Sequence, residues 1–328
     1  MFYSDDDLFD LHGLALVEVY DAAQETWHNT SVLEDLDSPR IRQQASELIE
    51  RAAERGCETV EDLLPRAAEV LRVVTGITHL TRYLPIEQAE TLQQYRAALG
   101  AVLAGAAIAT DADPMPLLAS LPDASARHGG PTRGLHDDEI LLLRLRALHL
   151  LQRGPRLVPA LLHTIMGDAG ARPSETTVIA ARHFDNVILP SRVDLPGVSQ
   201  MAAARTVPLP TWSRPLVAEV LARHVAVYQT DMPVAFRGKK PGGAAASASA
   251  SRILANAFAE VGIAEPPQPS ALARWRVAKT ADQGGLEAAA DISGHVKIDT
   301  ALSFMGRNVT SAKPRQRRRR RGYASGVA

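Results

Sequence analysis

The stretch GARPSETTVIAARHFD, residues 170–185, places an arginine and a glutamate three positions apart, at Arg172 and Glu175, just before an apolar run that leads to Asp185. Side chains three positions apart are neighbours on a helix surface, so these two can meet if a helix starts here. A guanidinium is a fork of N–H donors that suits a phosphate or a carboxylate. The stretch therefore offers either a phosphate contact or a structural ion pair.

A second stretch, LEAAADISGHVKIDTALSFMG at residues 286–306, ends an expected helix at a Gly-His pair. Glycine just after the last helical residue is a common stop signal. His295 completes the pair, and Phe304 follows nine positions later on an apolar stripe with Leu302 and Met305. The pattern predicts two helices joined by a Gly-His turn.

The first part of the chain is predicted to be entirely helical. Apolar periodicity and end signals place helices at residues 5–28, 39–56 and 59–76, with a fourth from Pro85 onward. Pro65 interrupts the third helix near its start, so one helix or two shorter ones are expected there. No alternating pattern predicts a strand before residue 125.

Later segments are more varied. Residues 111–134 are dense in proline, glycine and small polar residues, which is typical of an interdomain linker. Residues 186–210 mix β-branched and turn residues and predict a small sheet. The low-complexity stretch FRGKKPGGAAASASAS, residues 236–251, predicts a mobile loop. Two or three further helices are expected before Phe304.

Composition excludes several classes of protein. No uninterrupted apolar run of about 18 residues is present, which argues against a membrane span, and the acidic N-terminus argues against a secretory signal. The single cysteine, Cys57, excludes an internal disulfide framework and a cysteine-based zinc site. A cytoplasmic, nucleoid-associated location is expected.

Charge is divided unevenly along the chain. Residues 313–322 hold seven basic residues and no acid, so removing them from the net charge of −1 leaves residues 1–312 at −8. Arginine-dense arms gain affinity for nucleic acid through counterion release. The expected DNA-binding residues of this tail are Lys313, Arg315, Arg317, Arg318, Arg319, Arg320 and Arg321.

These blocks resemble the tyrosine recombinases, the phage integrase family. Residues 170–185 are similar to the family's Gly-x-Arg-x-x-Glu box, and ARTVPLP at 204–210 looks like its Arg-x-Val-Pro-Leu strand. Residues 286–306 look like its Gly-His turn and nucleophile helix. The N-terminal segments resemble its helical core-binding domain, so the resemblance covers roughly residues 30–310.

The resemblance implies a mainly α fold with a small β-sheet (α+β), in which a helical core-binding domain precedes a domain of the catalytic type. Its segments would be an N-terminal helical extension at 1–29, a SAM-like core-binding domain at 30–118, a linker at 119–134, a tyrosine-recombinase-like domain at 135–312 and a basic disordered tail at 313–328. Duplex DNA would be bound through the cleft of the second domain, the helical core-binding domain and the arginine tail.

In this family a tyrosine oxygen attacks a DNA phosphodiester while arginines, a lysine and histidines stabilise charge or move protons. The resemblance assigns Arg172 to the first arginine and His295 to the histidine of the Gly-His turn. The second arginine corresponds to Arg274 or Arg276, and a local deletion leaves both open. Because these two flank Trp275, a stacked basic-aromatic surface patch is the alternative.

Three of the six catalytic roles have no suitable residue. Phe304 takes the tyrosine position, and its ring has no oxygen to attack phosphorus. Gln200 takes the lysine position, and no lysine precedes Lys239. The histidine before the second arginine is missing, since no histidine lies between His224 and His295. The sequence therefore predicts that this site performs no chemistry.

Each of these residues also has a structural interpretation. Arg172 can pair with Glu175 within one helical turn, His295 can be a capping or core histidine, and Phe304 is expected to be a packing residue. The acidic run HDDE at residues 136–139 could be read as a metal cluster, but acids favour the first turn of a helix in any case. No metal site and no cofactor are expected.

The sequence is thus interpreted as a DNA-binding protein of tyrosine-recombinase fold that does not cut DNA alone. It would act as a site-specific or architectural factor, or as a non-catalytic subunit beside an active recombinase or identical protomers. The expected partner is double-stranded DNA, with no membrane. One alternative is an active recombinase that uses Tyr323 or a tyrosine supplied in trans. Another is a protein–protein interaction module without DNA binding, which the acidic body favours.

Overall fold

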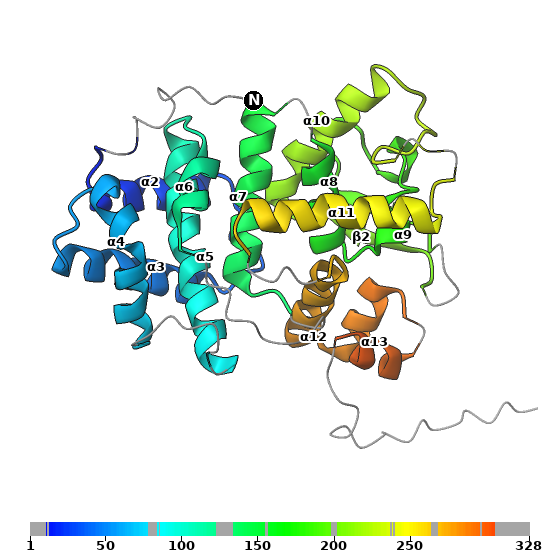
Figure 1. Ribbon diagram of the computed structural model, residues 1–328. Helices are drawn as coiled ribbons and strands as arrows, with labels where there is room; N and C mark the ends of the chain where they lie inside the picture. The colour runs from blue at the N-terminus through cyan, green and yellow to red at the C-terminus, as the bar shows by residue number, and fades with distance from the viewer. Residues whose placement is uncertain are drawn as a thin grey trace, which may run out of the picture.

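The structure is a computed structural model of the chain. It describes residues 11, 13–77, 84, 86–122, 134–154, 157–197, 202–236, 238, 240–263, 268–295 and 297–305. This part of the chain is mostly helical and has one antiparallel two-stranded sheet (Figure 1). The expected fold class, mainly α with a small β-sheet, is confirmed.

The described N-terminal part contains five bounded helices. They are α2 (Leu16–Asn29), α3 (Ser38–Glu54), α4 (Val60–Thr75), α5 (Ile86–Ala109) and α6 (Pro114–Ser120). Helix α2 begins at Leu16, so the prediction of one continuous helix from residue 5 is wrong at residues 13–15. Gly13 lies in a turn, and Ala15 is extended and forms a β-bridge with Thr59. Residues 5–10 and 12 of that prediction lie outside the described part.

Helix α4 is capped as the sequence predicts. Thr59 Oγ1 accepts the Asp62 N–H, and the Asp62 carboxylate accepts the Thr59 N–H. Pro65 lies inside the helix without dividing it, which excludes the two shorter helices. A proline this early removes one backbone hydrogen bond, and the buried face that includes Leu63 and Val70 continues past it.

Small residues let α2 and α5 approach each other closely. At Gly105 an added Cβ would lie 2.9 Å from Trp27 Nε1 and 3.0 Å from Ala23 Cα. The hydroxyl of Thr26 donates to the Gly105 carbonyl over 2.8 Å. A glycine is therefore required by the packing of the two backbones.

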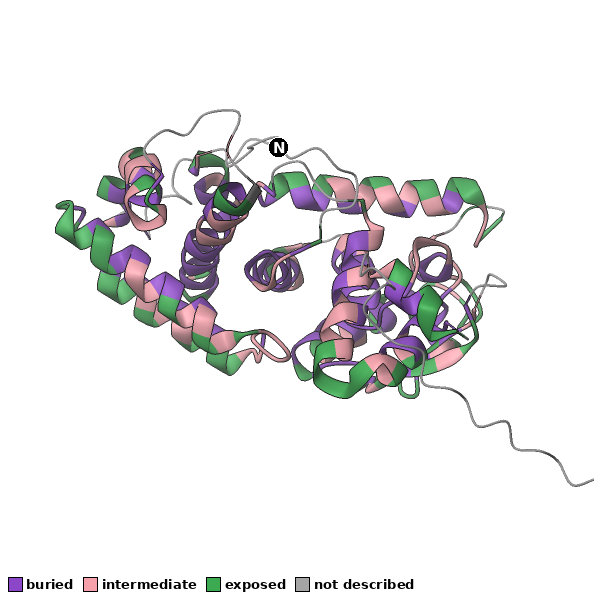
Figure 2. Ribbon diagram, turned by 90° about the horizontal axis from the view of Figure 1, so that it is seen from below, coloured by how far each residue is buried: buried purple, intermediate pink, exposed green. Residues whose placement is uncertain are grey.

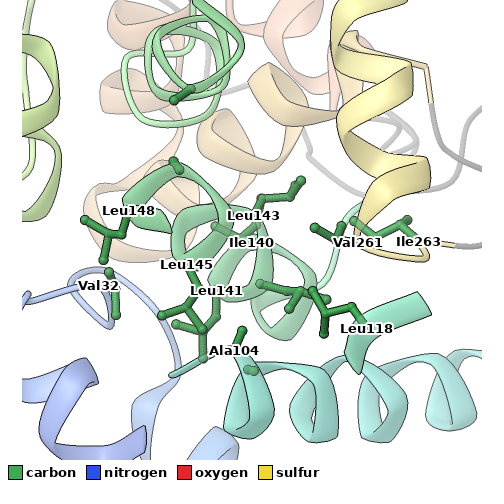
Figure 3. Close-up of a cluster of buried hydrophobic side chains, with 14 of the residues drawn as sticks. Val32, Ala104, Leu118, Ile140, Leu141, Leu143, Leu145, Leu148, Val261 and Ile263 are labelled. Carbon is green, nitrogen blue, oxygen red and sulfur yellow. The ribbon is translucent and has the colours of Figure 1, made fainter. Parts of the chain in front are cut away.

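Helix α7 (Asp137–Arg153) is the central element of the core. Figure 2 shows it end-on, and most of its surface is buried. In Figure 3 its leucines lie against Ala104 and Leu118 of the N-terminal part and against Val261 and Ile263 of the C-terminal part. A helix that is buried on nearly all sides is a core helix, and the buried residues of α7 include charged side chains as well as leucines. It joins both parts of the described chain into one continuous apolar core.

The C-terminal elements surround the sheet. They are α8 (Val158–Gly167), α9 (Pro173–Thr176), β1 (Arg192–Leu195), β2 (Arg205–Pro208), α10 (Arg214–Val225), α11 (Ala244–Glu260), α12 (Ser270–Ser293) and α13 (Ile298–Phe304). The strands β1 and β2 pair antiparallel with Leu195 opposite Arg205. The small sheet predicted within residues 186–210 is therefore present.

Two predictions about irregular segments need correction. The mobile loop predicted at residues 236–251 is wrong for residues 244–251, which form the first half of α11. Alanine has the highest helix propensity, and Ala246 and Ala250 are buried, so the repetitive sequence is amphipathic. Helix α6 occupies the start of the 111–134 segment, whereas residues 123–133 lie outside the described part.

Arg144 of α7 ties the segment before α3 to the C-terminal part. Its guanidinium donates to carbonyls within residues 32–34, at 2.6 and 2.8 Å, and to the Asp168 carboxylate at 2.6 Å. It also lies over the rings of Trp212 and Trp275, 5.1 and 5.8 Å from their centroids. This fully buried cation fixes the chain entry into α3 against the elements that carry the candidate site.

Candidate phosphate-binding site

Arg172 is the N-terminal cap residue of α9. Its backbone N–H donates to Glu175 Oε2 over 2.9 Å, so the box predicted to open a helix does so. The buried Glu175 carboxylate also receives the guanidinium of Arg205, at 2.7 and 3.0 Å. The ion pair expected as an alternative for Arg172 is therefore made by Arg205 instead, and the guanidinium of Arg172 takes another direction.

Arg205 connects three segments of the site. Besides its two bonds to Glu175, it donates to the carbonyl of Ile292 over 2.6 Å and to that of Gly170 over 3.3 Å. Sequence reasoning did not single it out. The ARTVPLP motif contains Arg205, but the motif does not reveal that the partner of this arginine is Glu175, which lies 30 positions earlier in the chain. Arg205 thereby holds the start of α9 against the end of α12.

The Gly-His turn ends α12 as predicted. Gly294 has φ of +69°, which glycine adopts without strain, and an added Cβ would lie 2.9 Å from the Ala203 carbonyl oxygen. The Ala203 N–H donates to the Gly294 carbonyl over 2.9 Å. The turn therefore lies directly against the backbone before β2, and His295 is buried beneath it.

The side chains of Arg172 and His295 meet in the site. Arg172 Nη2 lies 2.7 Å from His295 Nε2. Arginine has no acceptor, so Nε2 accepts and the ring proton is on Nδ1, which faces Ser293 Oγ at 2.7 Å. Burial lowers the pKa of His295, and the nearby charges of Arg172 and Arg205 lower it further. The imidazole is therefore neutral and orients the guanidinium.

Phe304 completes this cluster. Its ring centroid lies 5.3 Å from that of His295, and the Arg172 guanidinium carbon lies 6.0 Å from it. The ring is half-buried, in keeping with the packing role expected from the sequence. The Phe304 ring packs against Arg172 and His295. Leu302, on the same helix, is buried.

The two candidates for the second arginine have different surroundings. Arg276 donates to the Asp35 carboxylate over 2.9 Å and is largely buried. Arg274 is half-buried, its Nε and Nη2 atoms are enclosed without a hydrogen-bond partner among the described residues, and burial lowers its pKa. Trp275 between them is buried, with its N–H on Asp137 at 2.9 Å. The alternative of a stacked surface patch is therefore wrong.

A groove of about 570 Å³ opens beside this cluster, between α9, α11, α12 and α13. Arg172, His295 and Phe304 all line it. A larger cavity of about 900 Å³ lies between α6, α7 and the end of α11, and none of the three contributes to it. A third cavity, of about 710 Å³, is lined by residues 203–208, Arg276 and His295. The groove is the one of these three cavities that Arg172, His295 and Phe304 share.

Comparison with solved structures places this geometry among known folds. The matches include the XerA recombinase (TM-score 0.43, 14% identity, 89% of this chain and 95% of that one) and a lambda integrase dimer bound to a COC' core site (0.40, 14%, 84% and 91%). The Tn1549 transposon integrase in complex with circular intermediate DNA also matches (0.39, 16%, 80% and 94%). The chain is similar in fold to recombinases and integrases. No family model and no curated protein sequence matches it.

At identities of 14–16% and TM-scores of 0.43 or lower, this similarity concerns the fold alone. What the site can do has to follow from its own side chains. The groove is lined by the guanidinium of Arg172, the neutral imidazole of His295 and the ring of Phe304, which carries no hydroxyl.

The remaining predicted site residues lie outside the described part of the chain. They are Gln200, Lys313, Arg315, Arg317, Arg318, Arg319, Arg320, Arg321 and Tyr323. The HDDE run forms the first turn of α7, where the Glu139 carboxylate accepts the His136 N–H. The described residues include no group of acids, histidines or cysteines that could hold a metal ion, and no helix among them is long and apolar enough to cross a membrane.

Proposed function

We propose that the protein binds double-stranded DNA through the groove at Arg172 and does not cleave DNA by itself. One observation carries this proposal. Arg172, His295 and Phe304 are far apart in the sequence, and the fold brings them together around one groove. A phenylalanine ring stands where a tyrosine would have to attack phosphorus, so the site keeps donors for a phosphate and lacks the nucleophile.

The charge balance of the site suits a phosphodiester. The Glu175 carboxylate is neutralised by the two bonds from Arg205, so it does not repel an anion at Arg172. Arg274 is not among the described lining residues of the groove, and its Nε and Nη2 atoms are enclosed. The donor that faces the groove is the guanidinium of Arg172, a fork that suits phosphate oxygens.

The biological role follows from binding without cutting. A protein of this kind is a site-specific or architectural factor, or a non-catalytic subunit beside an active recombinase. The arginine tail adds affinity that does not depend on DNA sequence, because it neutralises phosphates and releases counterions.

The salt dependence of DNA binding tests this function. Each phosphate contact that is lost reduces the slope of log K against log salt by about 0.9. Arg172→Ala is expected to weaken binding and to reduce the slope by this amount. Arg182→Ala, which removes an exposed arginine paired with Asp231, is the matched control and is expected to leave both unchanged. An Arg172→Ala protein that is folded and binds like wild type would refute the proposal.

A second candidate function is a protein-interaction module, and the charge of the N-terminal helices favours it. Residues 16–77 hold thirteen acidic and six basic side chains. Such a surface repels DNA and suits a basic protein partner. If protein that ends at Ala312 had no affinity for DNA even at low salt, this candidate would replace the first.

A further inference from the structure

The groove beside Arg172 has a mostly apolar surface that carries hydroxyl groups from several helices. Six of its eleven described lining residues are serine or threonine, and no aspartate or glutamate is among them. The hydroxyl residues are Ser174, Ser247, Ser251, Ser270, Thr300 and Ser303. They come from four helices, α9, α11, α12 and α13, which the fold brings together at this place (Figure 1).

Most of these hydroxyls have nothing to bind within the protein. Ser247 donates to the Gly243 carbonyl over 3.1 Å, whereas the side chains of the other five make no hydrogen bond to any described residue. Serine in a helix usually turns its hydroxyl back to a carbonyl of the preceding turn. Ser251, one turn after Ser247 on the same helix, does not. Its hydroxyl is available to a ligand in the groove.

The ligand that fits such a lining is a chain of phosphodiesters. Hydroxyl groups donate to phosphate oxygens and are common backbone contacts on DNA. The absence of carboxylates from the lining removes the repulsion that an anion would meet.

We propose that the DNA backbone continues from the phosphate at Arg172 into this hydroxyl groove, where Ser251 of α11 and Ser270 of α12 donate to the neighbouring phosphates. This proposal rests on the proposed function. It adds a set of neutral contacts that position the strand without reading its sequence.

Neutral donors have a signature that differs from that of arginine. A serine contributes hydrogen bonds but neutralises no phosphate, so its loss weakens binding equally at all salt concentrations. The double variant Ser251→Ala/Ser270→Ala is expected to bind duplex DNA about tenfold more weakly, from roughly 0.7 kcal/mol per hydroxyl, with an unchanged salt slope. Ser249→Ala, on α11 but not lining the groove, is the matched control and is expected to bind like wild type.

A charge reversal gives a second, independent comparison. Ser251→Asp places a carboxylate in the groove and is expected to weaken binding by more than the alanine change, whereas Ser249→Asp is expected to weaken it less. Inorganic phosphate as a competitor separates a site for any phosphate from one for a DNA strand. Millimolar phosphate is expected to leave binding unchanged if the groove requires a polynucleotide.

The outcomes distinguish this proposal from the one on which it rests. If Arg172→Ala weakens binding while the serine variants bind like wild type, the hydroxyl groove is refuted and DNA binding at Arg172 stands. If Arg172→Ala has no effect, both are refuted. A serine double variant that changes the salt slope would also contradict the assignment, because it would mean that the contact is not a neutral one.

Discussion

Arg172 Nη2 lies 2.7 Å from His295 Nε2, although the two residues are 123 positions apart in the chain. The contact exists because Arg205 holds the start of α9 against the end of α12 through Glu175 and the Ile292 carbonyl. The guanidinium is therefore oriented before any ligand arrives. An oriented donor loses less conformational entropy on binding than a free one.

The buried pair of Arg205 and Glu175 is expected to support the fold as well as the site. Arg205→Met would leave the fully buried Glu175 carboxylate without its partner, and breaking a buried ion pair costs about 3–5 kcal/mol. The free energy of unfolding in urea measures this loss. Arg223→Met, which breaks an exposed pair with Glu219, is the control and should cost less than about 1 kcal/mol. Equal losses in the two variants would contradict the structure.

Helix α5 carries two glycines that are expected to respond differently to alanine. At Gly105 the new Cβ would meet backbone 3.0 Å away in α2, which cannot move cheaply, so a loss of about 1–3 kcal/mol is expected. At Gly100 the nearest atoms are the ends of Leu118 and Leu142, at 3.2 and 3.3 Å. There the gain in helix propensity, about 1 kcal/mol, offsets the crowding. Thermal unfolding of both variants would show the difference, and a stabilised Gly105→Ala protein would disprove the close packing.

The buried His163 is expected to make stability depend on pH. Burial, followed by the charges of Arg144 and Arg146, lowers its pKa to about 3. Between about pH 6.5 and 3 the unfolded chain binds a proton here that the folded chain does not, so the free energy of unfolding falls as pH decreases. The contribution lost by pH 5 is about 2 kcal/mol.

Urea unfolding at pH 7 and pH 5 isolates this effect. His163→Leu removes the titrating group, and its two nitrogens have no partner in the described structure, so the variant should lose about 2 kcal/mol less between the two pH values than wild type. His28→Leu, at an exposed position, is the control and should keep the wild-type pH dependence. If the free energy of unfolding of His163→Leu depended on pH as in wild type, a group other than His163 would bind the proton.

The absence of a nucleophile at position 304 predicts that no covalent protein–DNA adduct forms. Nicked duplexes that trap such adducts, resolved on a denaturing gel, are the measurement. Wild type and Tyr323→Phe should both give none. An adduct in wild type that disappears in Tyr323→Phe would establish the alternative, an active recombinase that uses the tail tyrosine.

Local signals in the sequence predicted much of the fold. The capping box at Thr59 and the glycine after α12 are short-range features whose chemistry acts within one turn, so their positions could be read directly. The start of α2 could not be predicted from local signals, because it depends on the β-bridge between Ala15 and Thr59. The helix in residues 244–251 was missed because an alternation of alanine and serine hides which alanines face the core.

The site was predicted in part for the same reason. Motif spacing identified Arg172, His295 and Phe304, and the structure brings all three together. Motif spacing could not decide between Arg274 and Arg276. The surroundings of Arg276 depend on Asp35, which lies 241 positions away in the chain. Motif spacing also could not show that the Glu175 carboxylate pairs with the guanidinium of Arg205 and not with that of Arg172. The pairing with Arg205 is a contact between residues 30 positions apart, which local spacing does not predict.

The proposed function requires that the folded body, and not only its arginine tail, binds DNA. The decisive measurement is a selection of bound fragments from a genomic library, with the full chain and with protein that ends at Ala312. Both proteins are expected to enrich the same sequence, and the shorter one is expected to bind more weakly and with a smaller salt slope. Binding that is lost together with the tail, with no sequence enriched by either protein, would contradict it.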